Sequence, residues 1–450
     1  MSEFRLQRKI SLSGAVFLLV GNVVGASIFI LPGQLAGIAG PAVFIAYLIA
    51  GIPAIMNCLI AAQVGSILPV SAADYVFTSV VLRPFLGFLK VWVGMIGLIV
   101  GVPILAYGFA DYMAFFFPDW DRLTIAVGIL LTLLVINLLG IQTSVRTQMA
   151  MVTIFIASLL IFGIGGLFYA DWDLLTPMVP NGINSVLNAA VPAFYSYSGF
   201  LTIVVVAEEI KNPSKNIPLT LLITFIIVAI IYTLITLVLP ALIPWEKLGT
   251  IVAPMSQASQ LFLPDWFAAI ITLSALLAAA TSINVGILTA SRSFFALARN
   301  QIYPKILSRI SKRTREPDAA LVLAVALSLG GVAIQGEIIE YASMTVVGIL
   351  LYGVVWAVAL TQFPKALPVH YANADFKLNF ATIWTVAVIK IVISVAFLYV
   401  GIRNNPGPTM IYMGLLSLGA VYYFLRSRYL ERHGISLQAI LRHEANQALN

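Results

Sequence analysis

Residues 21–33 hold the pattern on which the fold prediction depends, a run of small residues inside the long apolar stretch 12–38. They read Gly21-Asn22-Val23-Val24-Gly25-Ala26-Ser27-Ile28-Phe29-Ile30-Leu31-Pro32-Gly33. A glycine followed by two small residues at membrane depth predicts an interrupted helix, whose freed backbone groups must find partners in neighbouring helices, water or a ligand. Gly21 and Gly25 also form a GxxxG pair, so close packing between helices is the alternative explanation.

A second stretch, 185–208, carries the same features and favours the interruption. It contains Phe194-Tyr195-Ser196-Tyr197-Ser198-Gly199-Phe200. Gly25 is followed by a Gly-Pro exit at 40–41, and Gly199 by an Asn-Pro exit at 212–213, at a similar distance. The two stretches are the first and sixth predicted spans, five apart. Because an odd number reverses the direction across the bilayer, the two halves of the chain are predicted to be inverted copies whose breaks meet near the midplane.

The composition of the 450 residues excludes a soluble domain. Hydrophobic residues make up 61% and charged residues 10%, against about 45–50% and about 25% in ordinary soluble domains, and the mean hydropathy is +1.01. The apolar residues gather into twelve blocks, each near the roughly 20 residues that a helix needs to cross the bilayer. The predicted spans are 12–38, 42–66, 86–117, 122–139, 147–169, 185–208, 218–243, 265–297, 319–335, 341–361, 379–401 and 408–425.

The positions of the 25 basic residues predict the orientation. With the N-terminus inside, only Arg122, Lys247 and Arg403 fall in outer loops, and basic loops stay on the cytoplasmic side during insertion. We therefore expect a multi-pass protein of the cell membrane, in contact with lipid, with both termini cytoplasmic. The net charge of +7 follows from this topology and does not indicate nucleic acid as a partner.

Several classes of protein are excluded by what the chain lacks. One cysteine, Cys58, allows no disulfide framework. No metal cluster, HExxH helix, phosphate loop or GxSxG elbow falls within a span, which argues against an enzyme. No A-x-A cleavage site follows the first apolar residues, so 12–38 is expected to be a retained helix and not a signal peptide.

Four motifs together resemble the amino acid/polyamine/organocation (APC) superfamily. They are the run 21–33, the Gly199-Phe200 element, the loop 208–218 and the sequence from Ala290-Ser291-Arg292 to Tyr303-Pro304. The resemblance covers nearly the whole chain and implies the leucine-transporter fold: an all-α transport core at 12–361 with five plus five inverted helices, about 12–169 and 185–361, and broken helices 1 and 6. Two additional helices would follow at 379–425, with cytoplasmic segments at 1–11 and 426–450. It further implies alternating access around a central site.

The broken helices predict a site for a zwitterionic amino acid. The N–H groups of Ala26, Ser27 and Ile28 would face the cavity at the positive end of a helix dipole, which suits a carboxylate. Freed carbonyls suit an ammonium group; they belong to Val23, Val24, Phe194 and Tyr195. The resemblance adds a substrate pocket around Gly25 that consists of Ile96, Gly97, Tyr197, Ser198, Phe200 and Gly286. Tyr195 or Phe200 is the candidate lid, and core packing is the alternative for each aromatic residue.

Two absences bear on the substrate and its coupling. The predicted pocket has no ionised residue, and Leu201 stands where relatives for arginine or polyamines often carry a glutamate. A small neutral amino acid is therefore expected, with a polyamine or cationic amino acid as the alternative. Many proton-linked or uncoupled relatives carry a lysine whose ammonium group takes the place of a bound cation. Phe155 stands at that position here, so this ammonium group is missing.

A sodium site is the corresponding expectation. The segment 278–282 is similar to the sodium-binding segment of sodium-coupled symporters, and the resemblance implies five oxygen ligands, from Gly21, Val24, Ala278, Thr281 and Ser282. Ile28 stands where a second sodium would need a ligand, so at most one ion is predicted. The alternative is that the two hydroxyls bond their own helix. Sodium symport, proton symport and uncoupled exchange (antiport) therefore stay open.

Lys390 lies in the middle of the eleventh span. A lysine at this depth raises the free energy of membrane insertion by roughly 2.5–3.5 kcal/mol. A structural role, with the amine bonded to a carbonyl or water, is favoured over a contact with a lipid, a second subunit or a regulator. A channel or receptor built on the same helices remains the second functional class, but no polar-lined pore is found.

Overall fold

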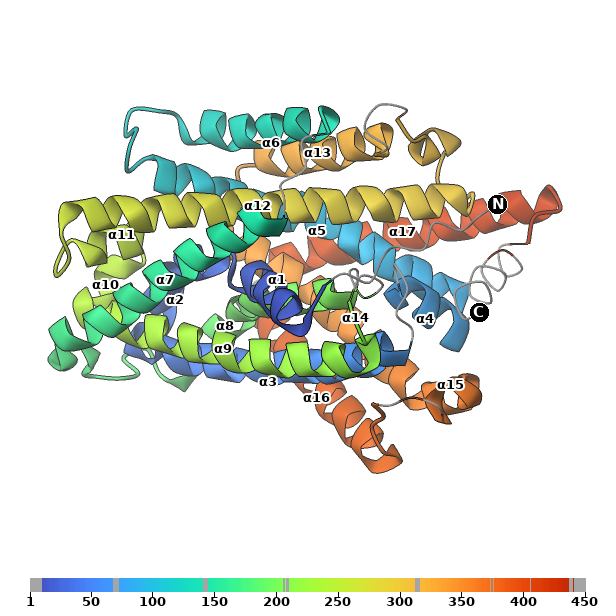
Figure 1. Ribbon diagram of the computed structural model, residues 1–450, viewed down its shortest axis with the longest axis horizontal. Coiled ribbons are helices and arrows are strands. Elements are labelled where there is room, and N and C mark those ends of the chain that lie inside the picture. Colours follow the sequence, from blue (N-terminus) through green and yellow to red (C-terminus); the bar gives the residue numbers. More distant parts are fainter. Residues whose placement is uncertain are drawn as a thin grey trace.

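The computed structural model describes residues 10–67, 73–140, 145–204, 207, 210–311, 316–372, 374, 376–404, 406–436 and 440. Over these ranges the chain is helical, with no strand and a single isolated bridge between Ile10 and Ile210. The helices form one elongated bundle (Figure 1). Residues 1–9 of the predicted segment 1–11, and residues 437–439 and 441–450 of the predicted segment 426–450, lie outside the described residues, whereas residues 426–432 continue the last helix.

The helices follow the predicted spans closely. The long helices are α3 (Val43–Ile67), α5 (Pro84–Met113), α6 (Arg122–Leu138), α7 (Val145–Tyr169), α9 (Pro213–Leu242), α12 (Asp265–Arg299), α13 (Asp318–Ala333), α14 (Ile338–Ala366), α16 (Phe380–Asn404) and α17 (Pro406–Arg432). Short elements connect them: η1 (Gly40–Ala42), α4 (Ala73–Val81), η2 (Trp172–Leu175), α10 (Trp245–Leu248), α11 (Pro254–Ser259), η5 (Lys305–Ser308) and α15 (Pro368–Ala372).

Start signals in the sequence explain where several helices begin. Pro84 and Pro213 occupy the first turns of α5 and α9, where a missing N–H costs nothing. Asp121 caps α6 by accepting the backbone N–H of Thr124. That hydrogen bond also lowers the pKa of the Asp121 carboxyl below its ordinary value.

Two helices are interrupted. The first predicted span is α1 (Leu12–Val24) and α2 (Ser27–Ala39), separated at Gly25, whose φ of 36° lies in the left-handed region. The sixth is α8 (Ile183–Ala193), which continues as the 3-10 helix η3 (Phe194–Val204). The second interruption therefore begins five residues before Gly199, just after Pro192, and covers more of the span than one glycine predicts.

Eight helical segments of the described chain are long and apolar enough to cross a membrane. One of them, Leu12–Ser66, contains α1, α2 and α3 in series, and α6 and α13 are shorter apolar helices. Large apolar side chains are exposed over the outer helices, with Phe168 82% exposed, as expected for a surface that faces lipid. The chain is therefore a polytopic α-helical membrane protein, whereas the count of twelve crossings and the inverted repeat stay predictions.

The bundle contains two groups of helices that pack internally. One group consists of α1, α3, α8, η3 and α9, and the other of α5, α12, α13 and α14. Both breaks lie in the first group. α16 contacts α3 and α8 of the first group and α14 of the second, so it lies at their junction.

Candidate functional site

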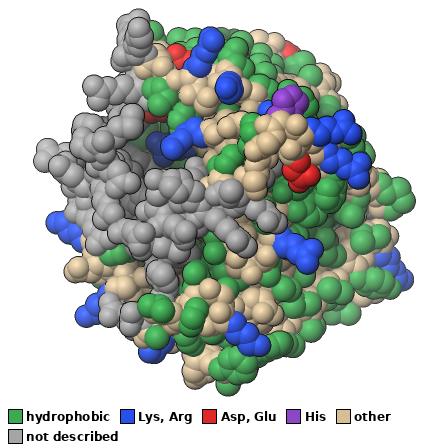
Figure 2. All heavy atoms as spheres, turned by 90° about the vertical axis from the view of Figure 1, so that its right-hand side faces the viewer, with side chains coloured by type: hydrophobic (Ala, Val, Ile, Leu, Met, Phe, Trp, Pro, Cys, Tyr) green, Lys and Arg blue, Asp and Glu red, His purple; other side chains and the backbone are tan. Residues whose placement is uncertain are grey.

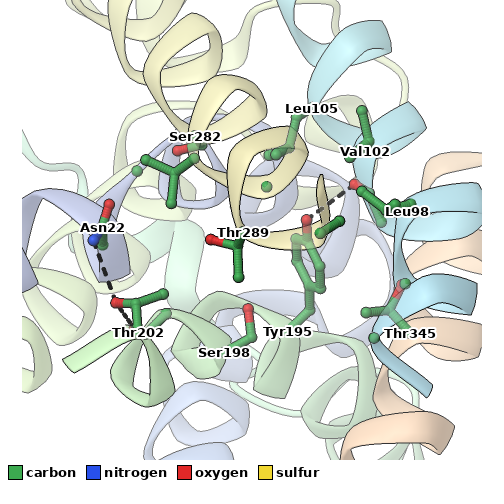
Figure 3. A pocket seen from close by; sticks show the side chains of 18 of the residues that line it. Asn22, Leu98, Val102, Leu105, Tyr195, Ser198, Thr202, Ser282, Thr289 and Thr345 are labelled. Atoms are coloured by element: carbon green, nitrogen blue, oxygen red, sulfur yellow. Dashed lines mark hydrogen bonds between the residues drawn. The ribbon is translucent and has the colours of Figure 1, made fainter. Parts of the chain in front are cut away.

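A cavity of about 310 Å³ lies between the two groups, beside both breaks (Figure 3). Its walls come from the α1–α2 break, α5, η3, α12 and α14. The lining residues include Asn22, Val23, Gly25, Ala26, Ser27, Lys90, Gly97, Leu98, Gly101, Leu105, Tyr195, Ser196, Ser198, Thr202, Ser282, Gly286, Thr289, Ser293 and Thr345. The walls are mostly apolar with scattered hydroxyls, as small-molecule sites usually are.

The first turn of α2 presents free N–H groups to this cavity. Ala26 and Ser27 line it, and the N–H groups of Ala26, Ser27 and Ile28 donate to no backbone carbonyl of the described chain. These are the donors that the start of a helix leaves unsatisfied, at the positive end of its dipole. The geometry suits an anionic group such as a carboxylate.

The two breaks touch each other directly. A Cβ on Gly199 would lie 2.6 Å from the Asn22 carbonyl oxygen and 2.8 Å from the Val23 Cα, so only glycine fits at this approach. The Asn22 side-chain amide donates to the Thr202 hydroxyl at 3.2 Å. The breaks are therefore joined by main-chain packing and by a side-chain hydrogen bond (Figure 3).

Tyr232 of α9 contacts both breaks. Its hydroxyl lies 2.8 Å from the Val23 carbonyl oxygen and 2.8 Å from the Ser196 carbonyl oxygen. One carbonyl thus comes from each interruption, where the helical partners are missing. Tyr232 packs edge-to-face on Tyr47 and Tyr197, which fixes its ring.

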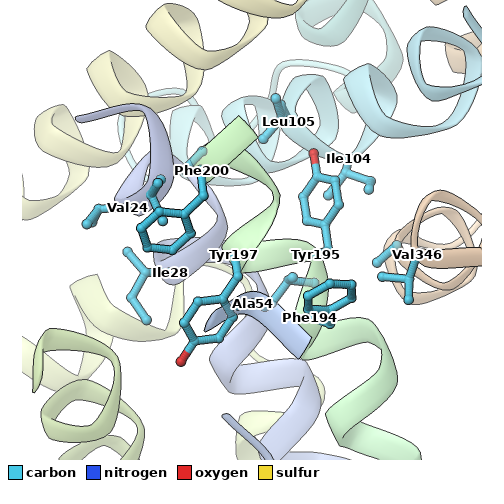
Figure 4. Packing of buried hydrophobic residues seen from close by; sticks show 14 of the residues in the cluster. Val24, Ile28, Ala54, Ile104, Leu105, Phe194, Tyr195, Tyr197, Phe200 and Val346 are labelled. Atoms are coloured by element: carbon cyan, nitrogen blue, oxygen red, sulfur yellow. The ribbon is translucent and has the colours of Figure 1, made fainter. Parts of the chain in front are cut away.

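The cavity brings eight of the fourteen predicted substrate residues together: Val23, Gly25, Ala26, Ser27, Gly97, Tyr195, Ser198 and Gly286. The other six are buried around it without lining it: Val24, Ile28, Ile96, Phe194, Tyr197 and Phe200. Tyr197 and Phe200 stack on each other and pack on Phe225 of α9, and neither lines the cavity. Figure 4 shows both rings among other buried hydrophobic residues. The alternative stated above, core packing, describes these two rings.

Of the four predicted aromatic residues, Tyr195 is the one that lines the cavity. Its hydroxyl donates to the Gly101 carbonyl oxygen of α5 at 3.1 Å, which connects the two helix groups across the site (Figure 3). Between the two candidate lids, the geometry favours Tyr195 over Phe200.

The cavity continues toward one end of the bundle only. It follows α5 to Lys90 and α12 to Phe294, near the start of α5 and the end of α12. Figure 2 views this end, over which Lys and Arg side chains are spread. Lys90 is the charged side chain that lines the cavity within the described residues.

At the opposite end α2 packs tightly and closes the cavity. Ile30 fills the space beside Gly108 of α5, and the Tyr112 hydroxyl donates to the Phe29 carbonyl at 2.8 Å. A Cβ on Gly37 would lie 2.8 Å from the Gly249 Cα. A second cavity of about 300 Å³ lies beyond this seal.

The predicted cation ligands are distributed over α1 and α12. The Thr281 hydroxyl donates within its own helix, to the carbonyls of Leu277 at 2.9 Å and Ala278 at 3.0 Å. The Gly21 carbonyl accepts the N–H of Gly25 at 3.2 Å. The Ser282 hydroxyl oxygen lies 2.7 Å from the position of a Cβ on Gly25, so it is directed at the first break.

Several contributors carry no signal in the sequence. Tyr232, Thr289 and Thr345 lie outside the breaks and motifs identified in the sequence, and nothing in the sequence distinguishes them from other polar residues in spans. Asn22 belongs to the run 21–33, which the sequence singles out. Its hydrogen bond with Thr202 depends on how the two breaks pack against each other, which the sequence does not show. Lys90 lies near the start of the predicted span 86–117, and the structure places it in the second turn of α5, where it lines the cavity.

Comparisons with known proteins identify the family of the chain. Residues 10–425 match the family model described as amino acid permease. The chain is similar to the methylthioribose transporter of Bacillus subtilis (strain 168), 27% identical over 94% of each chain. It is similar to the branched-chain amino acid permease BcaP of the same organism, 26% identical over 81% of this chain and 83% of that protein. The vacuolar cationic amino acid transporter 4 of Arabidopsis thaliana is 28% identical over 77% of this chain, which spans only 62% of that protein.

Proposed function

The chain belongs to the amino acid permease family of the APC superfamily, and from this premise we propose that it carries a small neutral amino acid across the membrane by alternating access. The observation that carries the proposal is the meeting of two broken helices at one closed-ended cavity of about 310 Å³. The free N–H groups at 26–28 supply the carboxylate subsite. Carbonyls of the unwound η3 supply the ammonium subsite.

The lining supports a neutral side chain on the substrate. No Asp or Glu is among the described residues that line the cavity, and Lys90 is at its open end. A cationic substrate would meet no counter-charge and would pass a like charge. The hydroxyls of Thr289, Ser293 and Thr345 allow a substrate with a polar group as well, so methylthioribose, which one relative is named for transporting, is the competing substrate.

The orientation and the repeat complete the proposal. With the N-terminus cytoplasmic and twelve crossings, the open end of the cavity faces the cytoplasm, and α1 to α7 and α8 to α14 form the two inverted halves. The structure then corresponds to an inward-facing state, with the α2 seal on the outside.

Uptake into proteoliposomes tests the carrier function. The assay uses labelled alanine, serine, valine, leucine, methionine, arginine and methylthioribose, with and without unlabelled solute inside. Saturable uptake of a neutral amino acid, at least 10-fold above empty vesicles, is expected. Uptake of arginine alone, or of methylthioribose alone, would identify that compound as the substrate in place of a neutral amino acid. Uptake of none of the compounds would favour a channel or receptor.

Sodium coupling is a separate proposal with a separate readout. One ion would be bound by Gly21, Val24, Ala278, Thr281 and Ser282 when the first break closes on α12. An inward sodium gradient is compared with potassium, in the wild type and in the double variant Thr281→Ala with Ser282→Ala. The matched control is Thr385→Ala with Ser417→Ala, whose exposed hydroxyls bond their own helices. Uptake that is equal in sodium and potassium would exclude the sodium site and leave the carrier intact.

A further inference from the structure

Lys390 is fully buried at the junction of the two helix groups. It extends from α16 toward α14 and η3, where its Nζ lies 5.2 Å from the centroid of the Phe194 ring. A Cβ on Gly353 of α14 would lie 2.9 Å from Nζ, so the glycine makes room for the amine. Asn57 Oδ1 of α3 lies 3.7 Å from the same position. Four elements therefore enclose one amine.

The amine has no hydrogen-bond partner within the described part of the chain. The helix α3 and the half-helix α8 carry no Asp, Glu, Lys or Arg. Near Nζ, η3 places the Phe194 ring, α3 places the Asn57 side chain and α14 places the main chain at Gly353. The predicted bond to a carbonyl is not formed within the described residues, and the predicted bond to water stays a prediction. A charged ammonium without a counter-ion in a dry interior is strongly disfavoured.

The charged residues of the surrounding helices are too far away to compensate. Glu340 and Lys365 of α14 lie roughly 20 Å and 18 Å along the helix from Gly353, at 1.5 Å per residue. Arg403 of α16 lies about 20 Å from Lys390 by the same measure. On α17 the charged residues are confined to its last turns, from Arg426 onward.

Two features favour the protonated amine at the same place. The Phe194 ring presents its π face to Nζ, and Phe194 caps the C-terminal end of α8, where the helix dipole is negative. The environment therefore opposes the charge by burial and supports it by the ring and the dipole. Both supporting groups belong to the interrupted helix that lines the substrate cavity on its other face, through Tyr195 and Ser196.

We propose that Lys390 is a proton-binding site of this carrier, with the proton as a coupling ion that is bound apart from the proposed sodium site. In the conformation seen here Nζ is sealed from solvent, so a proton can be exchanged with water only when α16 and α14 separate from η3. Protonation then puts an ammonium against Phe194 and the end of α8, and its release removes that contact. The proton is bound and released by the nitrogen lone pair, without another reactant. The proposal rests on the proposed carrier function and names a coupling ion.

Transport by three variants tests the site. The amino acid with the largest uptake in the assay above is supplied under an inward pH gradient without sodium. Wild-type protein should accumulate it at least 10-fold above the level without a gradient. Lys390→Met should lose this accumulation but keep exchange of labelled for unlabelled substrate, and Lys365→Met, which removes an exposed lysine of α14, should behave as the wild type. Gradient-driven accumulation that survives in Lys390→Met would overturn the proposal.

A measurement on wild-type protein covers the case in which Lys390→Met does not fold. The heat of substrate binding is measured at several pH values in phosphate and in Tris, because the difference between buffers gives the number of protons exchanged. The wild type should exchange a fraction of a proton that varies with pH, and Lys390→Arg, which keeps its charge, should exchange none. Substrate binding without proton exchange at any pH would reject the proton site while leaving the carrier established, whereas absence of any binding or uptake would reject the carrier itself.

Discussion

At the residue scale, the site depends on a few side chains that join the two interruptions. Gly199 allows the main chains to touch, and Asn22 and Thr202 bond across the contact. The Tyr232 hydroxyl, whose one proton the two acceptors share, lies 2.8 Å from a carbonyl oxygen of each break. An interrupted helix in a membrane costs several unsatisfied backbone groups unless neighbours provide partners. These residues therefore stabilise the breaks and set their distance from each other.

Replacement of Gly199 by alanine should disable transport. The added Cβ would meet the Asn22 carbonyl and the Val23 Cα at 2.6 and 2.8 Å, and backbone atoms cannot move aside cheaply. We expect a loss of about 1–3 kcal/mol in the free energy of unfolding and at least a 10-fold lower uptake rate. Gly128→Ala on α6, where the Cβ meets nothing within 4 Å, is the control. Unchanged uptake by Gly199→Ala would show that the contact of the breaks is not needed.

Tyr232→Phe should loosen the breaks without changing the size of the ring. The variant removes the one proton that the Val23 and Ser196 carbonyls share, and leaving a buried acceptor without its donor costs about 1–3 kcal/mol of stability. We expect substrate affinity to fall several-fold, measured by equilibrium binding, together with a lower melting temperature. Tyr399→Phe, on an exposed tyrosine of α16, should alter neither quantity, and equal effects of the two variants would contradict the role of Tyr232.

At the scale of elements, α2 closes one end of the cavity and η3 forms its wall. The seal consists of close approaches, Ile30 at Gly108 and Gly37 at Gly249, and it can open as a unit because few polar bonds cross it. Tyr195 adds the hydrogen bond to the Gly101 carbonyl that joins η3 to α5.

Gly37→Val should hold this end open, because the new side chain would overlap Gly249. In a Cys58→Ser background with Leu105→Cys inside the cavity, a membrane-impermeant thiol reagent applied outside should react at least 5-fold faster than without Gly37→Val. Gly128→Val is the matched control for an added branched side chain. If reactivity rose only from the cytoplasmic side, the proposed direction of the gate would be reversed.

At the scale of the whole molecule, two helix groups enclose the cavity, and α16 lies against both. The end with α15 and the open cavity is proposed as cytoplasmic, and the end with α10 and α11 as external (Figure 1). A relative movement of the two groups would open the α2 seal and change the surroundings of Lys390 together.

Single cysteines test this orientation. In the Cys58→Ser background, Thr250→Cys between α10 and α11 should be labelled by an impermeant reagent on intact cells, and Ala372→Cys in α15 only after permeabilisation. Both positions are exposed, so access to solvent is matched. The opposite pattern would place both termini outside and reverse the direction of the open cavity.

The sequence by itself determined the class of the molecule. The apolar blocks predicted an all-helical membrane protein and the positions of its long helices, and the glycine residues predicted the first break at Gly25. The bias of basic residues predicted the orientation. These predictions are possible because the thickness of the hydrocarbon layer and the need to pair backbone groups act locally along the chain. The family motifs added the central site, of which eight predicted residues line the cavity.

Tertiary structure alone decided which faces meet. Tyr197 and Phe200 pack toward α9 and do not line the cavity, and Tyr232 and Thr345 lie outside every motif identified in the sequence. Lys390 packs against η3 without a hydrogen-bond partner in the described chain. In spans that are apolar on every side, periodicity does not distinguish the face that meets lipid from the face that meets another helix. The direction of each side chain is set by packing between distant segments, and a linear sequence does not state which segments these are.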